Sequence, residues 1–149
     1  MALTVSIQGQ GRFDGLPARS TLVRWIGAAV ERDAELTLRF VGAAEARRLN
    51  REFRGKDYAT NVLTFDYQHA PVVLADIVLC VPVVRSEARA QRKAFPEHLA
   101  HLIVHGVLHA QGHDHDRAGD AKRMEACEVR ILAGLGIDDP YREGGVAGG

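Results

Sequence analysis

The sequence lacks the features of a secreted, disulfide-bonded or membrane-spanning protein. Its 149 residues include two cysteines, Cys80 and Cys127, which lie far apart and outside any CxxC pattern. This argues against a disulfide framework and a cysteine-based zinc finger, and it favours a reduced, cytoplasmic protein. The apolar runs are too short to cross a bilayer. The first ten residues lack the basic start and the length of a secretory signal.

Positive charge is not in excess either, because 19 Lys and Arg residues balance 19 Asp and Glu residues. Contact with nucleic acid would therefore depend on local basic patches. The composition, 46% hydrophobic and 26% charged, is that of a globular protein. We expect a single domain over residues 1–136. Residues 137–149, rich in Gly and Asp without apolar periodicity, are expected to form a flexible tail.

Hydrophobic periodicity predicts about four strands and about five helices. The strands are expected at residues 3–7, 35–41, 61–67 and 72–81, with an interruption at Asp76 in the last. The helices are expected at residues 20–32, capped by Ser20, and at 43–53, 82–93, 95–111 and 117–133. Because strands come early and helices dominate late, the predicted fold class is α+β, with one small mixed sheet covered by helices.

Histidines are concentrated in one segment, since six of the seven lie between His98 and His115. On a helix over residues 95–111, four of them fall within an arc of about 80°: His98, His101, His105 and His109. Histidines four residues apart can hold one metal ion, which leaves two candidate pairs, His101/His105 and His105/His109. All three cannot bind one ion, because about 12 Å of helix rise separates the outer two.

The residues that follow this helix favour the second pair. Gly112 can adopt the left-handed conformation that ends a helix, and the turn would bring His113 or His115 toward the ion. Three neutral imidazoles leave a tetrahedral zinc ion with one open position for water, as in catalytic sites. Zinc peptidases carry a glutamate directly after the first helical histidine as general base. Here that place is Gly106, which argues against peptide hydrolysis.

Three segments carry a family resemblance. HGVLHAQGHDH, residues 105–115, resembles the H-G-x-L-H-x-x-G-y-D-H signature of the YbeY family of bacterial endoribonucleases and rRNA maturation factors. LNREFRGKDYATNVLTF, residues 49–65, resembles the family block L-N-x-x-y-R-x-K-D-x-p-T-N-V-L-S-F, and ADIVLC resembles its G-D-I-x-I-C strand. The chain departs from these patterns at His113 for tyrosine, Ala59 for proline and Ala75 for glycine.

The resemblance implies a zinc-dependent endoribonuclease specific for single strands, acting in 16S rRNA maturation, ribosome assembly and quality control. It implies three ligands for one zinc ion per chain, His105, His109 and His115. It implies Arg54 as the catalytic arginine and Lys56 and Asn61 as substrate contacts. The implied partners are rRNA, small-subunit ribosomal proteins and an assembly GTPase, with no membrane association and a monomeric state.

Several points stay open at this level. Two basic runs, residues 47–56 and 85–93, could follow an RNA backbone or could be solvated helix faces. The general base is unassigned among His113, Asp114 and Asp116, and Asp114 could instead orient a ligand histidine. Asp76 has no assigned role. Two rival functions are a zinc hydrolase acting on another substrate, and a non-catalytic assembly factor that binds RNA and contains a structural zinc ion.

Overall fold

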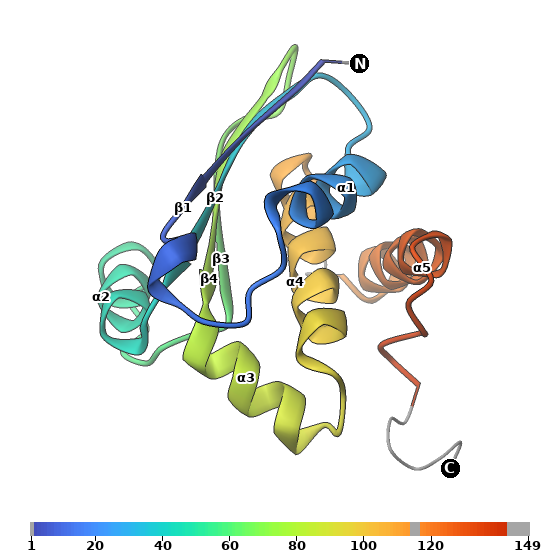
Figure 1. Ribbon diagram of the computed structural model, residues 1–149. Helices are drawn as coiled ribbons and strands as arrows, with labels where there is room; N and C mark the ends of the chain where they lie inside the picture. The colour runs from blue at the N-terminus through green and yellow to red at the C-terminus, as the bar shows by residue number, and fades with distance from the viewer. Residues whose placement is uncertain (1, 114–116, 143–149) are drawn as a thin grey trace.

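A four-stranded sheet flanked by five helices makes up the part of the chain that the computed structural model describes, residues 2–113 and 117–142 (Figure 1). The elements in chain order are β1 (Leu3–Gln8), a 3-10 turn (Gln10–Arg12), α1 (Arg19–Ala29), β2 (Ala34–Val41), α2 (Ala43–Arg54), β3 (Val62–Gln68), β4 (Val73–Cys80), α3 (Val81–Ala90), α4 (Phe95–Ala110) and α5 (Ala118–Gly134). The predicted α+β class is confirmed, and the element boundaries lie close to those expected from periodicity.

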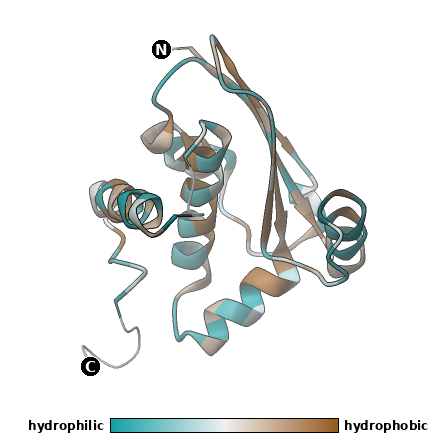
Figure 2. Ribbon diagram, turned by 180° about the vertical axis from the view of Figure 1, so that it is seen from behind, coloured by the Kyte–Doolittle hydropathy of each residue, from teal (hydrophilic) through white to brown (hydrophobic). Residues whose placement is uncertain are grey.

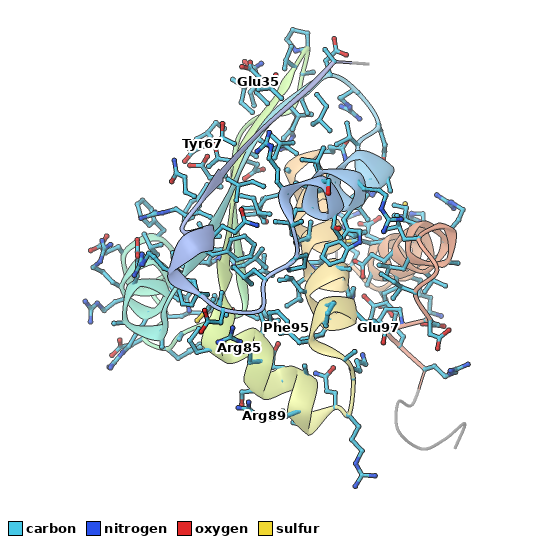
Figure 3. The ribbon with its side chains drawn as sticks, in the orientation of Figure 1. Glu35, Tyr67, Arg85, Arg89, Phe95 and Glu97 are labelled. Atoms are coloured by element: carbon cyan, nitrogen blue, oxygen red, sulfur yellow. The ribbon has the colours of Figure 1, made fainter. Side chains whose placement is uncertain are left out.

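The sheet has the strand order β1-β2-β4-β3. β1, β2 and β4 run parallel, whereas β3 is an antiparallel edge strand that pairs with β4. β4 continues through Asp76, so the predicted interruption is wrong. The Asp76 side chain accepts a hydrogen bond from the Tyr67 hydroxyl at 2.8 Å, and Figure 3 shows Tyr67 on the side of the sheet away from α4. A carboxylate therefore fits in this strand because a neighbouring side chain satisfies it.

The two faces of the sheet are covered unequally. α1, α3, α4 and α5 lie on one side and α2 lies on the other (Figure 1). The main core joins β-strand residues such as Leu38 and Ile77 to Ile103 and Val107 of α4, all fully buried. A smaller apolar cluster lies beneath α2. The strands are mostly hydrophobic and α2 is mostly hydrophilic in Figure 2, as expected for an inner sheet and a helix that covers it with one face.

Helix α4 is held closely against the sheet and against α1. A Cβ atom added at Gly106 would lie 2.8 Å from Ile77 Cγ2, so glycine permits this approach. At the helix end, the buried Gln111 side chain donates to the Ala29 carbonyl at 2.8 Å and accepts from the Glu31 amide at 2.6 Å. These contacts fix the position and rotation of the helix that carries the histidines.

The turn after α4 has the predicted form. Gly112 adopts a left-handed conformation, with φ of +99°. The His113 amide then donates back to the Leu108 carbonyl at 3.1 Å, a hydrogen bond typical of helices that end on glycine. An uninterrupted helix through His109 and His113 does not form.

The start of α1 differs from the expectation. Ser20 does not cap α1, because the helix begins one residue earlier, at Arg19, with Ala18 as the N-cap.

Of the segment expected to form a tail, residues 137–142 are described. Ile137 packs against the core and the Pro140 carbonyl accepts from Lys93 Nζ at 2.7 Å. Within the described residues, no helix combines the length and apolar composition needed to cross a bilayer.

Candidate active site

A polar pocket of about 270 Å³ lies between α4, β3 and the C-terminal end of α2. Its described lining residues are Arg54, Thr60, Asn61, Val62, Thr64, Asp66, His105 and His109. Val62, Thr64 and Asp66 are alternate residues of β3, which point to the same side of the strand. The pocket therefore forms where an edge strand, a histidine-bearing helix and an arginine-bearing helix end meet.

His105 and His109 lie one turn apart on α4, as their spacing predicted, and both line this pocket. Their ring centroids are 4.8 Å apart. Nδ1 of His105 lies 2.8 Å from Oε2 of Glu128 on α5. A carboxylate in that position accepts the Nδ1 proton, which leaves Nε2 as the ring nitrogen that can bind a ligand.

Glu128 is a residue that the sequence interpretation missed. It is fully buried, and it also contacts Nε2 of His101 at 2.7 Å and accepts from the hydroxyl of Tyr141. Burial alone would raise the pKa of this carboxyl. The hydrogen bonds from His101, His105 and Tyr141 outweigh burial and lower the pKa to about 2. The side chain is therefore a buried, charged hydrogen-bond acceptor.

The other described histidines of the cluster do not line the polar pocket, and each contacts a glutamate. Nε2 of His101 is occupied by Glu128, and Nε2 of His98 lies 2.9 Å from Glu87. His113, which the sequence offered as a competing ligand, lies 2.8 Å from Glu31 through Nε2 and lines a different pocket. Of the two candidate pairs, His105 and His109 are the pair that shares the polar pocket.

The imidazole groups of His105 and His109 are suited to bind a zinc ion in the pocket. Imidazole nitrogen is a preferred zinc ligand, and a carboxylate bonded to the second ring nitrogen is the usual support for a metal-binding histidine. Within residues 2–113 and 117–142, no three potential metal-ligating side chains form a cluster. The third predicted ligand, His115, and the candidate bases Asp114 and Asp116 lie outside the described residues.

Arg54 reaches the pocket as the last residue of α2. The helix ends there because Gly55 adopts a left-handed conformation, with φ of +70°. Asn61 also lines the pocket, and its amide nitrogen donates to Glu87 at 3.1 Å. Lys56 is exposed and is not among the described lining residues. Three candidates from two distant segments, Arg54, His105 and His109, thus meet in one cavity.

Most of the two basic runs do not face this pocket. Arg47 pairs with Asp57 at 2.8 Å and Arg51 approaches the same carboxylate at 3.6 Å. Arg85 and Arg89 lie on α3 (Figure 3) and line a separate pocket. The described geometry therefore favours a helix face for these residues, ion-paired in the case of Arg47 and Arg51, with Arg54 as the member that lines the polar pocket.

Two further features of the site had no clear signal in the sequence. Asp66 lines the pocket, and its carboxylate lies 2.7 Å from Nε2 of His69. Phe53, which precedes Arg54, is 64% exposed, and its ring meets Phe65 of β3 edge to face at a centroid distance of 5.2 Å. Phe53 is therefore an exposed aromatic side chain next to a residue that lines the pocket, and such a ring can contact an unpaired base.

The fold and the pocket define a class: a single-sheet α+β protein with a candidate site on a histidine-bearing helix. The family model described as Endoribonuclease YbeY matches residues 19–136. The Endoribonuclease YbeY of an Acidovorax species is 62% identical over 145 residues, which cover 93% of this chain and 95% of the relative. The Endoribonuclease YbeY of Polaromonas naphthalenivorans is 59% identical over 125 residues, 83% of each chain. The chain belongs to the YbeY family.

A solved structure supports the fold independently. The solution structure of a Thermotoga maritima protein matches with a TM-score of 0.56 at 22% identity. The match covers 93% of this chain and 99% of that protein.

Proposed function

We propose that this protein is a zinc-dependent endoribonuclease that cleaves single-stranded RNA, and that it acts in the cytoplasm in 16S rRNA maturation, ribosome assembly and quality control. The observation that carries the proposal is the meeting of Arg54 with His105 and His109 in one polar pocket, in a chain of an endoribonuclease family. Small-subunit ribosomal proteins and an assembly GTPase are the proposed partners of a monomer.

His105 and His109, together with His115, would hold the zinc ion. When bound, zinc polarises a phosphoryl oxygen or lowers the pKa of its water toward neutrality. Arg54 offers a planar guanidinium that matches two phosphate oxygens, and its place at the end of α2 aims it at the same cavity. Its role is to bind the scissile phosphate and to offset the negative charge that grows in the transition state.

Asn61 is the proposed second substrate contact, because it lines the pocket in a fixed orientation. Its side-chain oxygen accepts from the Val62 amide at 2.7 Å while its nitrogen donates to Glu87. Lys56, two residues beyond Arg54 on an exposed turn, would contact a phosphate farther along the strand. Farther along β3, Asp66 also lines the pocket with a carboxylate that lies 2.7 Å from Nε2 of His69.

The decisive experiment measures cleavage of a single-stranded RNA by highly purified protein. The wild-type protein should cut the RNA, lose this activity on treatment with a chelator and regain it when zinc is added. The His109→Ala variant, prepared identically, should be inactive. Equal cleavage by both proteins would assign the activity to a contaminating ribonuclease. Tight RNA binding without cleavage by the zinc-loaded wild type would instead support the non-catalytic assembly factor.

The same assay tests the substrate class. We expect single-stranded RNA to be preferred over duplex and little selection for base sequence, because the nine aromatic residues of the sequence do not form the paired stacking signature of an RNA-reading sheet. Recognition through phosphates makes binding weaken steeply as salt increases. An affinity that barely changes between low and moderate salt would contradict the proposal, as would strong selection for one short sequence by the isolated protein.

A further inference from the structure

The buried carboxylate of Glu128 lies on the apolar face of α5. Met124 and Leu132, one turn before and one turn after it, are both buried in the main core. A charged carboxylate in such a place is strongly unfavourable unless hydrogen bonds satisfy it. Glu128 meets this condition through three side chains from two other segments of the chain: His101 and His105 of α4, and Tyr141.

The two carboxylate oxygens have different partners. Oε2 lies 2.8 Å from Nδ1 of His105, whereas Oε1 lies 2.7 Å from Nε2 of His101 and accepts from Tyr141. Opposite ring nitrogens of the two histidines are therefore engaged. His105 contacts the carboxylate through Nδ1, and its ring lines the polar pocket. His101 uses Nε2 for the carboxylate, and its Nδ1 is buried without a hydrogen-bond partner among the described residues.

This difference explains how a stripe of four histidines yields one pair for the pocket. Helical spacing alone allows His101/His105 as readily as His105/His109. Glu128 contacts Nε2 of His101, which does not line the polar pocket, and Nδ1 of His105, which does. The carboxylate thus distinguishes two otherwise equivalent pairs on the same helix face.

We propose that Glu128 is the positioning residue of the metal site: it fixes the Nδ1–H tautomer and the ring orientation of His105, and it prevents His101 from serving as a ligand. This inference rests on the zinc site of the proposed function. It assigns to a residue of α5 the supporting role that the sequence interpretation offered to Asp114. Removal of such a support typically weakens metal binding by about 10- to 100-fold.

The test compares Glu128→Gln with the wild-type full-length chain. Glutamine keeps the shape of the side chain, but its amide has one accepting oxygen and one donating nitrogen. It cannot accept a proton from both histidines, so one of them must change tautomer or lose its contact. Glu125→Gln is the matched control, since it removes the same charge on the same helix, and Glu125 lines a small pocket with His105 and Glu128.

Zinc affinity is measured by competition with a chelator, and the stability of the zinc-free proteins is measured by thermal unfolding. We expect Glu128→Gln to bind zinc about 10- to 100-fold more weakly than wild type and Glu125→Gln to bind within about twofold. Unchanged affinity in Glu128→Gln overturns the proposal. So does a lower melting temperature without any loss of affinity, because that result describes a purely structural residue.

A second measurement uses the wild-type protein, and it tests the role of Glu128 even if Glu128→Gln fails to fold. Nitrogen-15 NMR of the zinc-free wild type reports which ring nitrogen of His105 carries the proton. We expect the proton on Nδ1 and not on Nε2, and the Nε2–H tautomer would overturn the proposal. Failure of the wild type to bind zinc overturns this inference together with the zinc dependence of the proposed function. Zinc binding without RNA cleavage overturns the proposed activity alone.

Discussion

Arg54 and His109 line the same pocket although their helices lie on opposite faces of the sheet. Helix α2 packs over one face and α4 over the other, and the two meet at the edge strand β3. The edge of the sheet allows this arrangement, because no further strand lies beyond β3 to separate the two faces. The antiparallel addition of β3 to an otherwise parallel sheet therefore brings an arginine to the histidines.

Replacement of Arg54 by glutamate should abolish RNA cleavage, by at least about 100-fold, because the variant loses a phosphate-binding cation and gains a repelling charge. Zinc content should not change, since arginine is not a ligand, and stability should change little at this exposed position. The measurements are initial cleavage rates, metal analysis and thermal unfolding.

Arg51→Glu is the control for this change in charge. Arg51 lies one turn earlier on α2 and faces Asp57 instead of the pocket. Its cleavage rate should fall by a few fold at most, through weaker general attraction to RNA. Equal losses in the two variants would mean that net charge, and not the position of Arg54, determines the activity.

The zinc content of alanine variants should distinguish the histidines that are zinc ligands from those that are not. His105→Ala and His109→Ala should each lose the one zinc ion per chain, because each removes a ligand from the pocket. His113→Ala should retain it, since His113 contacts Glu31 and lines a different pocket. Metal analysis after dialysis against a weak chelator gives the answer. Loss of zinc from His113→Ala would place that residue among the ligands.

Substitution of Gly106 by alanine should destabilise the protein, because its Cβ would lie 2.8 Å from Ile77 Cγ2 in the helix–sheet contact. Overpacking of this kind costs about 1–3 kcal/mol, partly offset by the better helix propensity of alanine. Gly119→Ala on α5 is the control. Its Cβ would meet the flexible end of Arg123 at 3.6 Å, and it should be neutral or stabilising.

The double variant Gly106→Ala/Ile77→Ala then identifies the contact. If Ile77 is the obstacle, the added cost of Gly106→Ala should nearly disappear in the Ile77→Ala background. Denaturant unfolding of the four proteins of this cycle supplies the free energies. An undiminished cost would locate the strain elsewhere in the helix.

The stability of the zinc-free protein should depend on His98 at mildly acidic pH. Burial lowers the pKa of His98 below its ordinary value of 6.5, only partly opposed by Glu87, and nearby His101 and Lys93 lower it further. Below pH 6.5 the unfolded chain therefore binds a proton at this residue that the folded chain does not, so folding stability falls as the pH decreases.

His98→Gln removes this titration while keeping a group that can donate to Glu87. The wild type should lose more unfolding free energy than the variant between pH 8 and pH 5.5, by less than about 1.4 kcal/mol per pH unit. Denaturant unfolding at the two pH values measures the difference. Parallel losses in the two proteins would contradict a buried, neutral His98.

The sequence was most informative where one local rule determined the result. Helical spacing placed His105 and His109 on one face, and Gly112 ended the helix as expected. Glu128 could not be assigned in this way. The apolar residues of α5 suggest a stripe through Met124, Cys127, Ile131 and Leu135. Which other positions are buried depends on how α5 packs against α4 and Tyr141, and that information is not local.

Similar reasons explain the smaller errors. Ser20 is a good capping residue, but α1 starts one residue before the position that would use it. Asp76 seemed to interrupt a strand because its partner, the Tyr67 hydroxyl, comes from the neighbouring strand. For the first basic run the sequence left an RNA track and a solvated helix face open, because the pairing of Arg47 with Asp57 joins residues ten positions apart and is not a local pattern.

The tight contact at Gly106 also limits how this scaffold can evolve. The general-base glutamate of helical zinc peptidases would have to occupy position 106, where even a methyl group meets Ile77. A single substitution there would disturb the packing between α4 and the sheet before it could supply a base. Peptide hydrolysis by that mechanism would require coordinated changes in a helix and in a central strand.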